Sequence, residues 1–353
     1  MTIIIAILLF SLLVFVHELG HFLTAKACGV QVNEFSIFMG PAIFKKQVGE
    51  TLYAIRCIPF GGYCAMEGED GDSENPRAFG RAAWWKKLLI LIAGAAMNLI
   101  MGILLLAVVF APEKRYISPV ISEIDPNSSV CVPGGLQPGD RILKVDGERV
   151  YMQQDFSMLL SLNPSDTHDL VVKRNGEKVR LDNFLMEKRE FPNEDGTVSL
   201  RYGFSFTLED SDFGSFLNHV WFTAVDTVRL VRLSLKMLFT GQAGIKDMTG
   251  PVGIVQQISL TAQQSPDTFS AVMNVLSFGA FIAINLAVMN MLPIPALDGG
   301  RVFCLLVTVL IEAITHKKVN PKYESYIRAA GMVLLLGLMA VVTFEDIFRI
   351  FRR

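Results

Sequence analysis

Charged residues are scarce in this sequence. They make up 19% of the 353 residues, against 51% for hydrophobic residues, and the mean hydropathy is +0.41. This composition is too apolar for an ordinary soluble domain of this length. The formal net charge is −2, and this balance argues against nucleic acid as a partner.

Cysteines are also few, and their spacing is irregular. Their number is odd, and no pair shows CxxC spacing. The pattern argues against a disulfide framework and against a cysteine-ligated metal. The five cysteines are Cys28, Cys57, Cys64, Cys131 and Cys304.

Long apolar runs are present instead. The longest, Leu88–Ala111, has 24 residues and no charge. A helix of that length reaches roughly 36 Å, which is enough to cross a bilayer. We predict an α-helical polytopic membrane protein with about four transmembrane helices. The other three apolar runs are Ile3–Val16, Ala271–Leu297 and Ala329–Phe344.

Two apolar segments need separate treatment. Val302–Ile314 is short and contains Glu312, so we expect an interfacial or re-entrant helix there. The first run resembles a signal peptide, because Ala25-Lys26-Ala27 could be a cleavage site. No Lys or Arg precedes that run, however, and a retained helix is the better interpretation.

The basic residues of the loops predict the orientation. The segment Lys26–Lys87 holds eight Lys and Arg, and Arg301–Arg328 holds five. Such loops favour the cytoplasm. We therefore expect a multi-pass membrane protein with both termini outside, together with the segment of about 155 residues between the second and third crossings.

An HExxH sequence stands near the end of the first apolar run, at His17-Glu18-Leu19-Gly20-His21. On a helix, positions i and i+4 share one face, so both imidazoles can bind one Zn²⁺. Glu18 can then take a proton from the attacking water. Solvated polar residues at a helix end are the alternative, but ionisable groups inside a membrane are costly and usually functional.

A third ligand is needed, and Asp298 is the strongest candidate. It ends the third apolar run, where Pro293 and Pro295 must break the helix and two glycines follow. A count of residues along the helices places His17 and Asp298 in the inner half of the membrane. The remaining histidines lie in polar or charged surroundings and are poor candidates: His168, His219 and His316.

These residues resemble the site-2 protease family of intramembrane zinc metalloproteases, and within it the bacterial RseP-like branch. The resemblance rests on HExxH at 17–21 and NxxPxPxLDGG at 290–300, and it covers nearly the whole chain. Other matching segments are Gly29–Val32, Phe35–Ile37, Ile58–Tyr63, Arg77–Phe79 and Thr249–Ile254. One departure is Phe38-Met39-Gly40, where relatives tend to carry Gly-x-Gly, so the substrate-facing loop differs here.

The resemblance implies a location in the bacterial inner membrane, a site, a cofactor and a substrate class. Glu18 is the implied general base. The implied zinc ligands are His17, His21 and Asp298, and the residues implied to shape the site or hold an unwound substrate are Asn290, Pro293 and Pro295. Single-span membrane proteins are the implied substrates, cut after a first external cleavage, as in anti-sigma factor release or signal-peptide clearance.

Two regions outside the apolar runs are β-prone. Val30–Ile37 and Leu52–Ile58 predict a cytoplasmic-side, membrane-associated hairpin, with turns at Gly40-Pro41 and Gly49, whose edge could hold substrate by strand addition. Gly134–Gly147 resembles part of a PDZ domain, expected outside the membrane either as a peptide binder or as a passive module.

The predicted organisation has seven segments. They are 1–28 (first transmembrane helix), 29–87 (hairpin region), 88–112 (second transmembrane helix), 113–190 (PDZ-like domain), 191–268 (external linker and amphipathic helix), 269–314 (third transmembrane helix, motif and short helix) and 315–353 (fourth transmembrane helix and tail). We expect Phe213–Thr240 to form the amphipathic helix.

Two other functions compete with the protease. A non-catalytic membrane scaffold that presents a PDZ module would need neither Glu18 nor Asp298. A metal transporter would also use buried histidines, but transporters usually show internal repeats and several broken helices. This sequence has no recognisable repeat and one such break.

Overall fold

The computed structural model divides the chain into two compact units. One comprises residues 1–109 and 227–353, and the other residues 110–226. We refer to them as the helical unit and the β-rich unit. The structure describes residues 2–69, 71, 73–163, 165–192, 197–242, 244, 253, 256–257, 260, 265, 267–317 and 321–351.

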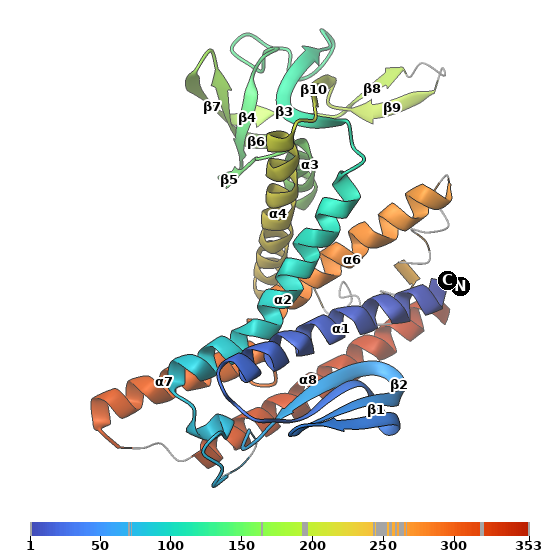
Figure 1. Cartoon of the computed structure of the whole chain (residues 1–353). Helices are drawn as coiled ribbons and strands as arrows, with labels where there is room; N and C mark the ends of the chain where they lie inside the picture. Colours follow the sequence, from blue (N-terminus) through green and yellow to red (C-terminus); the bar gives the residue numbers. More distant parts are fainter. Residues whose placement is uncertain are drawn as a thin grey trace. The chain divides into compact units, whose positions relative to one another are not determined.

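The helical unit contains three helices that are long and apolar enough to cross a membrane, within the described part of the chain. They belong to α1 (Thr2–Ala27), α2 (Trp84–Phe110) and α6 (Thr268–Asn290) (Figure 1). Two more helices follow, α7 (Asp298–Thr315) and α8 (Pro321–Phe351). The prediction of a polytopic membrane protein is thereby confirmed. Within α8 the apolar stretch Ala329–Phe344 is shorter, and its crossing stays a prediction.

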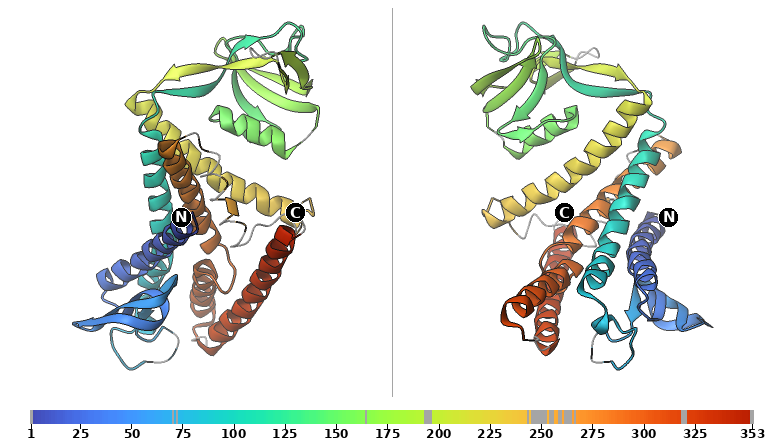
Figure 2. Two further views of the ribbon diagram at one scale, coloured as in Figure 1. Left: turned by 90° about the vertical axis from the view of Figure 1, so that its right-hand side faces the viewer. Right: turned by 60° about the vertical axis from the view of Figure 1, so that its left-hand side comes forward.

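Strands β1 (Val32–Val48) and β2 (Thr51–Met66) form a long hairpin, with its turn at Gly49-Glu50. The hairpin lies along α1 (Figures 1 and 2). Residues 34–37 lie between two stretches of β2, with 62–65 on one side and 52–55 on the other. The turn predicted at Gly40-Pro41 is therefore a bend within β1, at which Gly40 has a φ of +84° that favours glycine.

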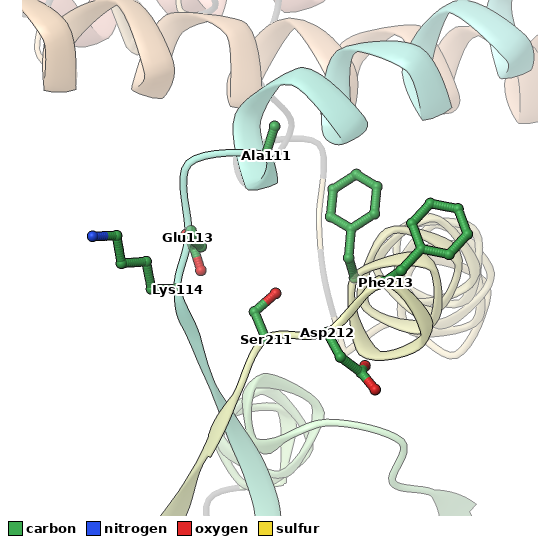
Figure 3. A pocket seen from close by; sticks show the side chains of 7 residues that line it. Ala111, Glu113, Lys114, Ser211, Asp212 and Phe213 are labelled. Atoms are coloured by element: carbon green, nitrogen blue, oxygen red, sulfur yellow. The ribbon is translucent and has the colours of Figure 1, made fainter.

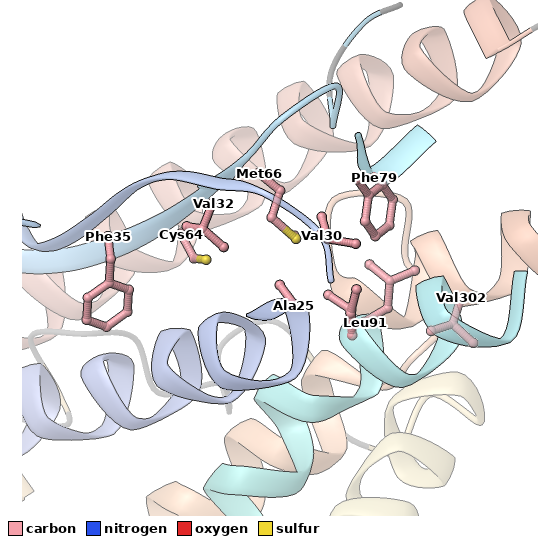
Figure 4. Close-up of a cluster of buried hydrophobic side chains, with 10 residues drawn as sticks. Ala25, Val30, Val32, Phe35, Cys64, Met66, Phe79, Leu91 and Val302 are labelled. Atoms are coloured by element: carbon pink, nitrogen blue, oxygen red, sulfur yellow. The ribbon is translucent and has the colours of Figure 1, made fainter. Parts of the chain in front are cut away.

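A core of buried apolar side chains joins this hairpin to the helices (Figure 4). It includes Ala25 at the end of α1, Phe35 on β1, Leu91 on α2 and Val302 on α7. Phe79 belongs to the same core and lies on the short 3₁₀ helix η1 (Phe79–Arg81). Segments far apart in the sequence are thus held together around the cytoplasmic end predicted for α1.

The β-rich unit is built on a six-stranded sheet. Five of its strands are paired in the order β10-β3-β4-β6-β7, and β5 also pairs with β4. The elements that lie in this unit, in chain order, are β3 (Arg115–Ile124), β4 (Arg141–Val145), β5 (Glu148–Arg149), α3 (Gln153–Leu162), β6 (Thr167–Arg174), β7 (Glu177–Leu185), β8 (Arg189–Pro192), β9 (Val198–Arg201) and β10 (Phe204–Asp210). Helix α4 (Phe213–Phe239) begins in this unit and ends in the helical unit. Helix α3 packs against β3 and β4 (Figure 2).

Several predictions about this region can be compared with the structure. The helix predicted over Phe213–Thr240 is confirmed as α4. The sheet does not end at residue 190, however, because β10 pairs with β3 and completes it. The β-rich unit therefore takes in residues 191–210, which were expected to be linker.

A buried ion pair fixes one loop of the β-rich unit. Asp140 is fully buried, and its carboxylate accepts hydrogen bonds of 2.8 and 2.7 Å from the Arg174 guanidinium. The hydrogen bonds with Asp140 raise the pKa of Arg174. Asp140 also accepts from the backbone N–H of Gln137, at 2.9 Å. This pair ties the glycine-rich loop before β4 to β6.

We expect Asp140→Asn to destabilise the β-rich unit by about 3 kcal/mol, because it leaves a largely buried guanidinium without its counter-charge. The matched control is Asp210→Asn, since Asp210 pairs with Arg115 at the surface, where both side chains are exposed. Proteolysis of the full-length protein should become faster within 110–226 only for Asp140→Asn. Equal cleavage of the two variants would contradict the expectation.

Candidate metal centre

Three side chains converge in the helical unit. His17 and His21 lie one turn apart on α1, and their Nε2 atoms are 3.2 Å apart. The Asp298 Oδ2 atom lies 3.1 Å from Nε2 of His17 and 3.2 Å from Nε2 of His21. All three side chains are at most 15% exposed. Among the described residues, this is the one group of three or more His, Cys, Asp or Glu side chains that could hold a metal ion.

The break between α6 and α7 places Asp298. Helix α6 ends at Asn290, Leu297 caps the next helix, and Asp298 is the first residue of α7. A Cβ atom on Gly299 would collide with the backbone of Met291 and Leu292, and one on Gly300 with the backbone of Ile294. The two glycines are thus required by close backbone packing, as well as by the turn that the sequence predicts.

An ion pair secures the same turn. Arg301, one turn after Asp298, donates a 2.6 Å hydrogen bond to Glu69 in the loop after β2, and both side chains are largely buried. The start of α7 is therefore attached to the hairpin. This contact restricts the movement of Asp298 relative to α1.

The three ligand atoms fit a tetrahedral zinc ion. With bonds of about 2.0–2.1 Å and tetrahedral angles, ligand atoms should be about 3.3 Å apart. The observed separations of 3.1–3.2 Å come close to this value. The Asp298 Oδ2 atom is buried without a hydrogen-bond partner among the described residues. A shared cation would satisfy it, and three protein ligands leave the fourth position open.

The other nitrogen of each imidazole also has neighbours. His21 Nδ1 donates a 2.8 Å hydrogen bond to the backbone carbonyl of Ile90 on α2. This bond leaves the lone pair of Nε2 facing the site. His17 Nδ1 lies 3.3 Å from Nδ2 of Asn98 on α2 and 3.4 Å from Nδ2 of Asn290.

Glu18 lies between the histidines in sequence and next to the hairpin in space. It is half-buried, and a Cβ atom on Gly62 of β2 would stand 3.6 Å from its Cγ atom. The same Cβ would stand 2.9 Å from the Ser36 carbonyl oxygen. Gly62 therefore lets the hairpin approach the residue that the HExxH pattern nominates as base.

Two residues at this site were not identified from the sequence. A Cβ atom on Gly94 of α2 would collide with Nε2 of His21 and stand 2.7 Å from Cε1 of His17. Asn98, one turn further along α2, is 1% exposed and lies at His17. The available signal was that Asn98 is the one polar side chain in Leu88–Ala111.

The other predicted site residues are placed as follows. Pro293 is exposed and Pro295 half-buried in the segment between α6 and α7. Pro295 packs against α8, where a Cβ atom on Gly331 would stand 2.5 Å from its Cβ. Of the motif Thr249–Ile254, all but Gly253 lies outside the described residues.

The remaining histidines are engaged elsewhere. His168 Nδ1 forms a 2.8 Å hydrogen bond with Asp146, and His219 stacks on Tyr116 in the β-rich unit. His316 caps the C-terminus of α7. The elimination of these histidines as third ligands agrees with their positions.

The β-rich unit has a surface hollow of about 430 Å³ at the junction of β10 and α4 (Figure 3). Its lining mixes single charged groups with apolar side chains: Ala111, Glu113, Lys114, Ser211, Asp212, Phe213 and Phe216. Partial burial raises the pKa of Glu113. The hollow lacks a set of convergent ligand groups, and we do not regard it as a catalytic site.

The chain is similar to known proteins over nearly its whole length. The model of peptidase family M50 matches residues 5–338. A protein of Clostridium perfringens, provisionally named as a zinc metalloprotease, is 36% identical, and the match covers 98% of each chain. The regulator of sigma-W protease RasP of Bacillus subtilis is 27% identical, with 99% of each chain covered. The zinc metalloprotease RasP of Oceanobacillus iheyensis is 28% identical over the same shares. The chain therefore belongs to peptidase family M50, the site-2 proteases, and is a zinc metalloprotease.

Proposed function

We propose that this protein cuts peptide bonds within the transmembrane segments of single-span membrane proteins. The observation that carries the proposal is the convergence of His17, His21 and Asp298 next to Glu18 on α1, a helix long and apolar enough to span the membrane. A protease site on such a helix acts on substrates that lie in the bilayer.

The side chains divide the work as follows. His17, His21 and Asp298 would hold Zn²⁺, which would supply Lewis acidity toward a carbonyl and toward the attacking water. Glu18 takes the proton from the attacking water and delivers it to the leaving amine. Asn290, whose amide lies at the site, is available to contact the substrate.

The hairpin presents the substrate. A helical segment hides its carbonyls in its own hydrogen bonds, so it must be unwound before cleavage. In β2, residues 62–66 pair with β1 on one side and have no strand on the other among the described residues. This edge passes Glu18 at Gly62 and can hold an extended peptide by strand addition.

The membrane arrangement has four crossings, with α8 as the fourth. Exposed apolar side chains on α8, such as Val333, Leu334 and Phe344, suit contact with lipid. At the start of α2, exposed Trp84 and Trp85 precede Lys86 and Lys87, which is typical of a cytoplasmic interface. The termini and the β-rich unit then lie outside, with the site towards the cytoplasm.

The β-rich unit acts as a PDZ-like module outside the membrane. It selects substrates whose external domain has already been removed, either by size or by binding a new C-terminus. The name of the Bacillus subtilis relative, a regulator of sigma-W protease, supports a membrane-bound anti-sigma factor as one substrate. Clearance of signal peptides is the second substrate class that we propose.

Metal analysis tests the ligand assignment. We expect about one Zn²⁺ per chain in the wild-type protein. His21→Ala should lose most of the zinc, because two remaining ligands hold it far more weakly. The control is His316→Ala, which removes an imidazole from the C-terminus of α7, away from the three ligands. Full zinc occupancy in His21→Ala would refute the assignment.

A further inference from the structure

The two histidines at the metal centre are supported differently. The Nδ1 of His21 has a backbone acceptor, the carbonyl of Ile90, at 2.8 Å. Among the described residues, the hydrogen-bond neighbours of His17 Nδ1 are two side chains, the amides of Asn98 and Asn290, at 3.3 and 3.4 Å. A histidine that binds zinc through Nε2 carries its proton on Nδ1 and needs an acceptor there. For His17, that acceptor must come from one of the two amides.

The structure distinguishes between the two amides. Asn98 is 1% exposed, whereas Asn290 is half-buried. The Oδ1 atom of Asn98 is buried without a hydrogen-bond partner among the described residues. The amide nitrogen of Asn98 lies at His17 Nδ1. In this arrangement the amide donates to Nδ1, and His17 carries its proton on Nε2. A half-turn of the amide exchanges oxygen and nitrogen within nearly the same volume.

We propose that Asn98 is the positioning residue of His17. When zinc is bound, the Asn98 amide oxygen accepts the proton of His17 Nδ1 and keeps the Nε2 lone pair directed at the metal. An amide serves both states, because it donates to Nδ1 without metal and accepts from it with metal. The inference rests on the proposed zinc ligands, and it leaves Asn290 free to contact the substrate.

The position of Asn98 on α2 suits this role. Gly94, one turn earlier on α2, packs against the imidazoles of His17 and His21 and leaves no room for a side chain. Asn98 therefore follows on the helix face that meets the site. The helix supplies one backbone acceptor, from Ile90, and one amide, from Asn98, so that both histidines are oriented by α2.

The test compares zinc dissociation constants by chelator competition in the purified full-length protein. Asn98→Leu keeps the branched shape of the side chain and removes the acceptor, and we expect it to weaken zinc binding about 10–100-fold. Asn98→Asp keeps an acceptor, and its affinity should stay close to that of the wild type. The matched control is Asn290→Leu, which should keep zinc affinity while cleavage falls.

Each outcome bears on the proposal. Wild-type zinc affinity in Asn98→Leu would overturn it. So would an Asn98→Asp variant as weak as Asn98→Leu, since this result would indicate that only packing matters. If Asn98→Leu does not fold, as judged by melting of the zinc-free protein, Asn98→Ala replaces it under the same criteria. His17→Ala tests the underlying function separately: unchanged zinc affinity there would refute the ligand set rather than the role of Asn98.

Discussion

A Glu18→Gln variant is expected to bind about one Zn²⁺ per chain and to cleave at least about 10²-fold more slowly than the wild type. The amide keeps the shape of the side chain but cannot take a proton from water. The three proposed ligands, His17, His21 and Asp298, are untouched. The measurement is cleavage of a single-span substrate in liposomes, with its external domain removed beforehand and zinc determined on the same samples.

The matched comparison is Asp298→Asn, which should lose zinc and activity together. Cleavage by the wild type shows that the substrate is suitable. A Glu18→Gln variant that cuts at the wild-type rate would exclude Glu18 as the base. If the wild type and Glu18→Gln both hold zinc and neither cuts any of several substrates, the scaffold function regains support.

Gly94→Ala is expected to lower zinc affinity by about 100-fold, at the upper end of the range for disturbed ligand support. The added methyl group would collide with Nε2 of His21, the atom assigned to the metal. Cleavage should fall to about 1% of the wild-type rate, because a shift of about 1 Å in a catalytic group costs that much. Chelator competition and the liposome assay measure both effects.

Gly102→Ala is the matched control on the same helix face, two turns further along α2. Its methyl group would meet the side chain of Ile284, 2.5 Å from Cγ1, and no metal ligand. This variant should be less stable to heat yet keep its zinc affinity. If Gly94→Ala and Gly102→Ala bound zinc equally well, zinc binding would not depend on the close approach of α2 to the histidines.

The parts of this protein that the sequence predicts are those encoded locally. Charge-free apolar runs predicted the helices α2 and α6. The i, i+4 spacing of His17 and His21 predicted that both lie on one face of α1. Asp298 could be proposed as the third ligand because two prolines and two glycines interrupt an apolar run at that point. Each of these signals is contained in a few consecutive residues.

The features that could not be predicted depend on contacts between distant segments. Asn98 is the one polar residue in an otherwise apolar stretch of α2, but the sequence does not show that its face of the helix meets α1. The bent hairpin depends on Phe38, which adopts a φ of +70° although it is not a glycine. Strand β10 follows the separate pair β8–β9, so its return to β3 is a non-local pairing that alternation cannot reveal.

The proposed ligands come from opposite ends of the chain, and this separation sets an order of events during synthesis. Asp298 is translated 281 residues after His17, which takes roughly 14–56 s at bacterial elongation rates of about 5–20 residues per second. Until then a growing chain holds both histidines and the proposed base, Glu18, without the carboxylate of Asp298. Ribosome-arrested chains that stop before residue 298 should therefore bind zinc weakly and cleave nothing. With the proposed ligand set, the growing chain cannot cleave neighbouring membrane proteins before Asp298 has been made.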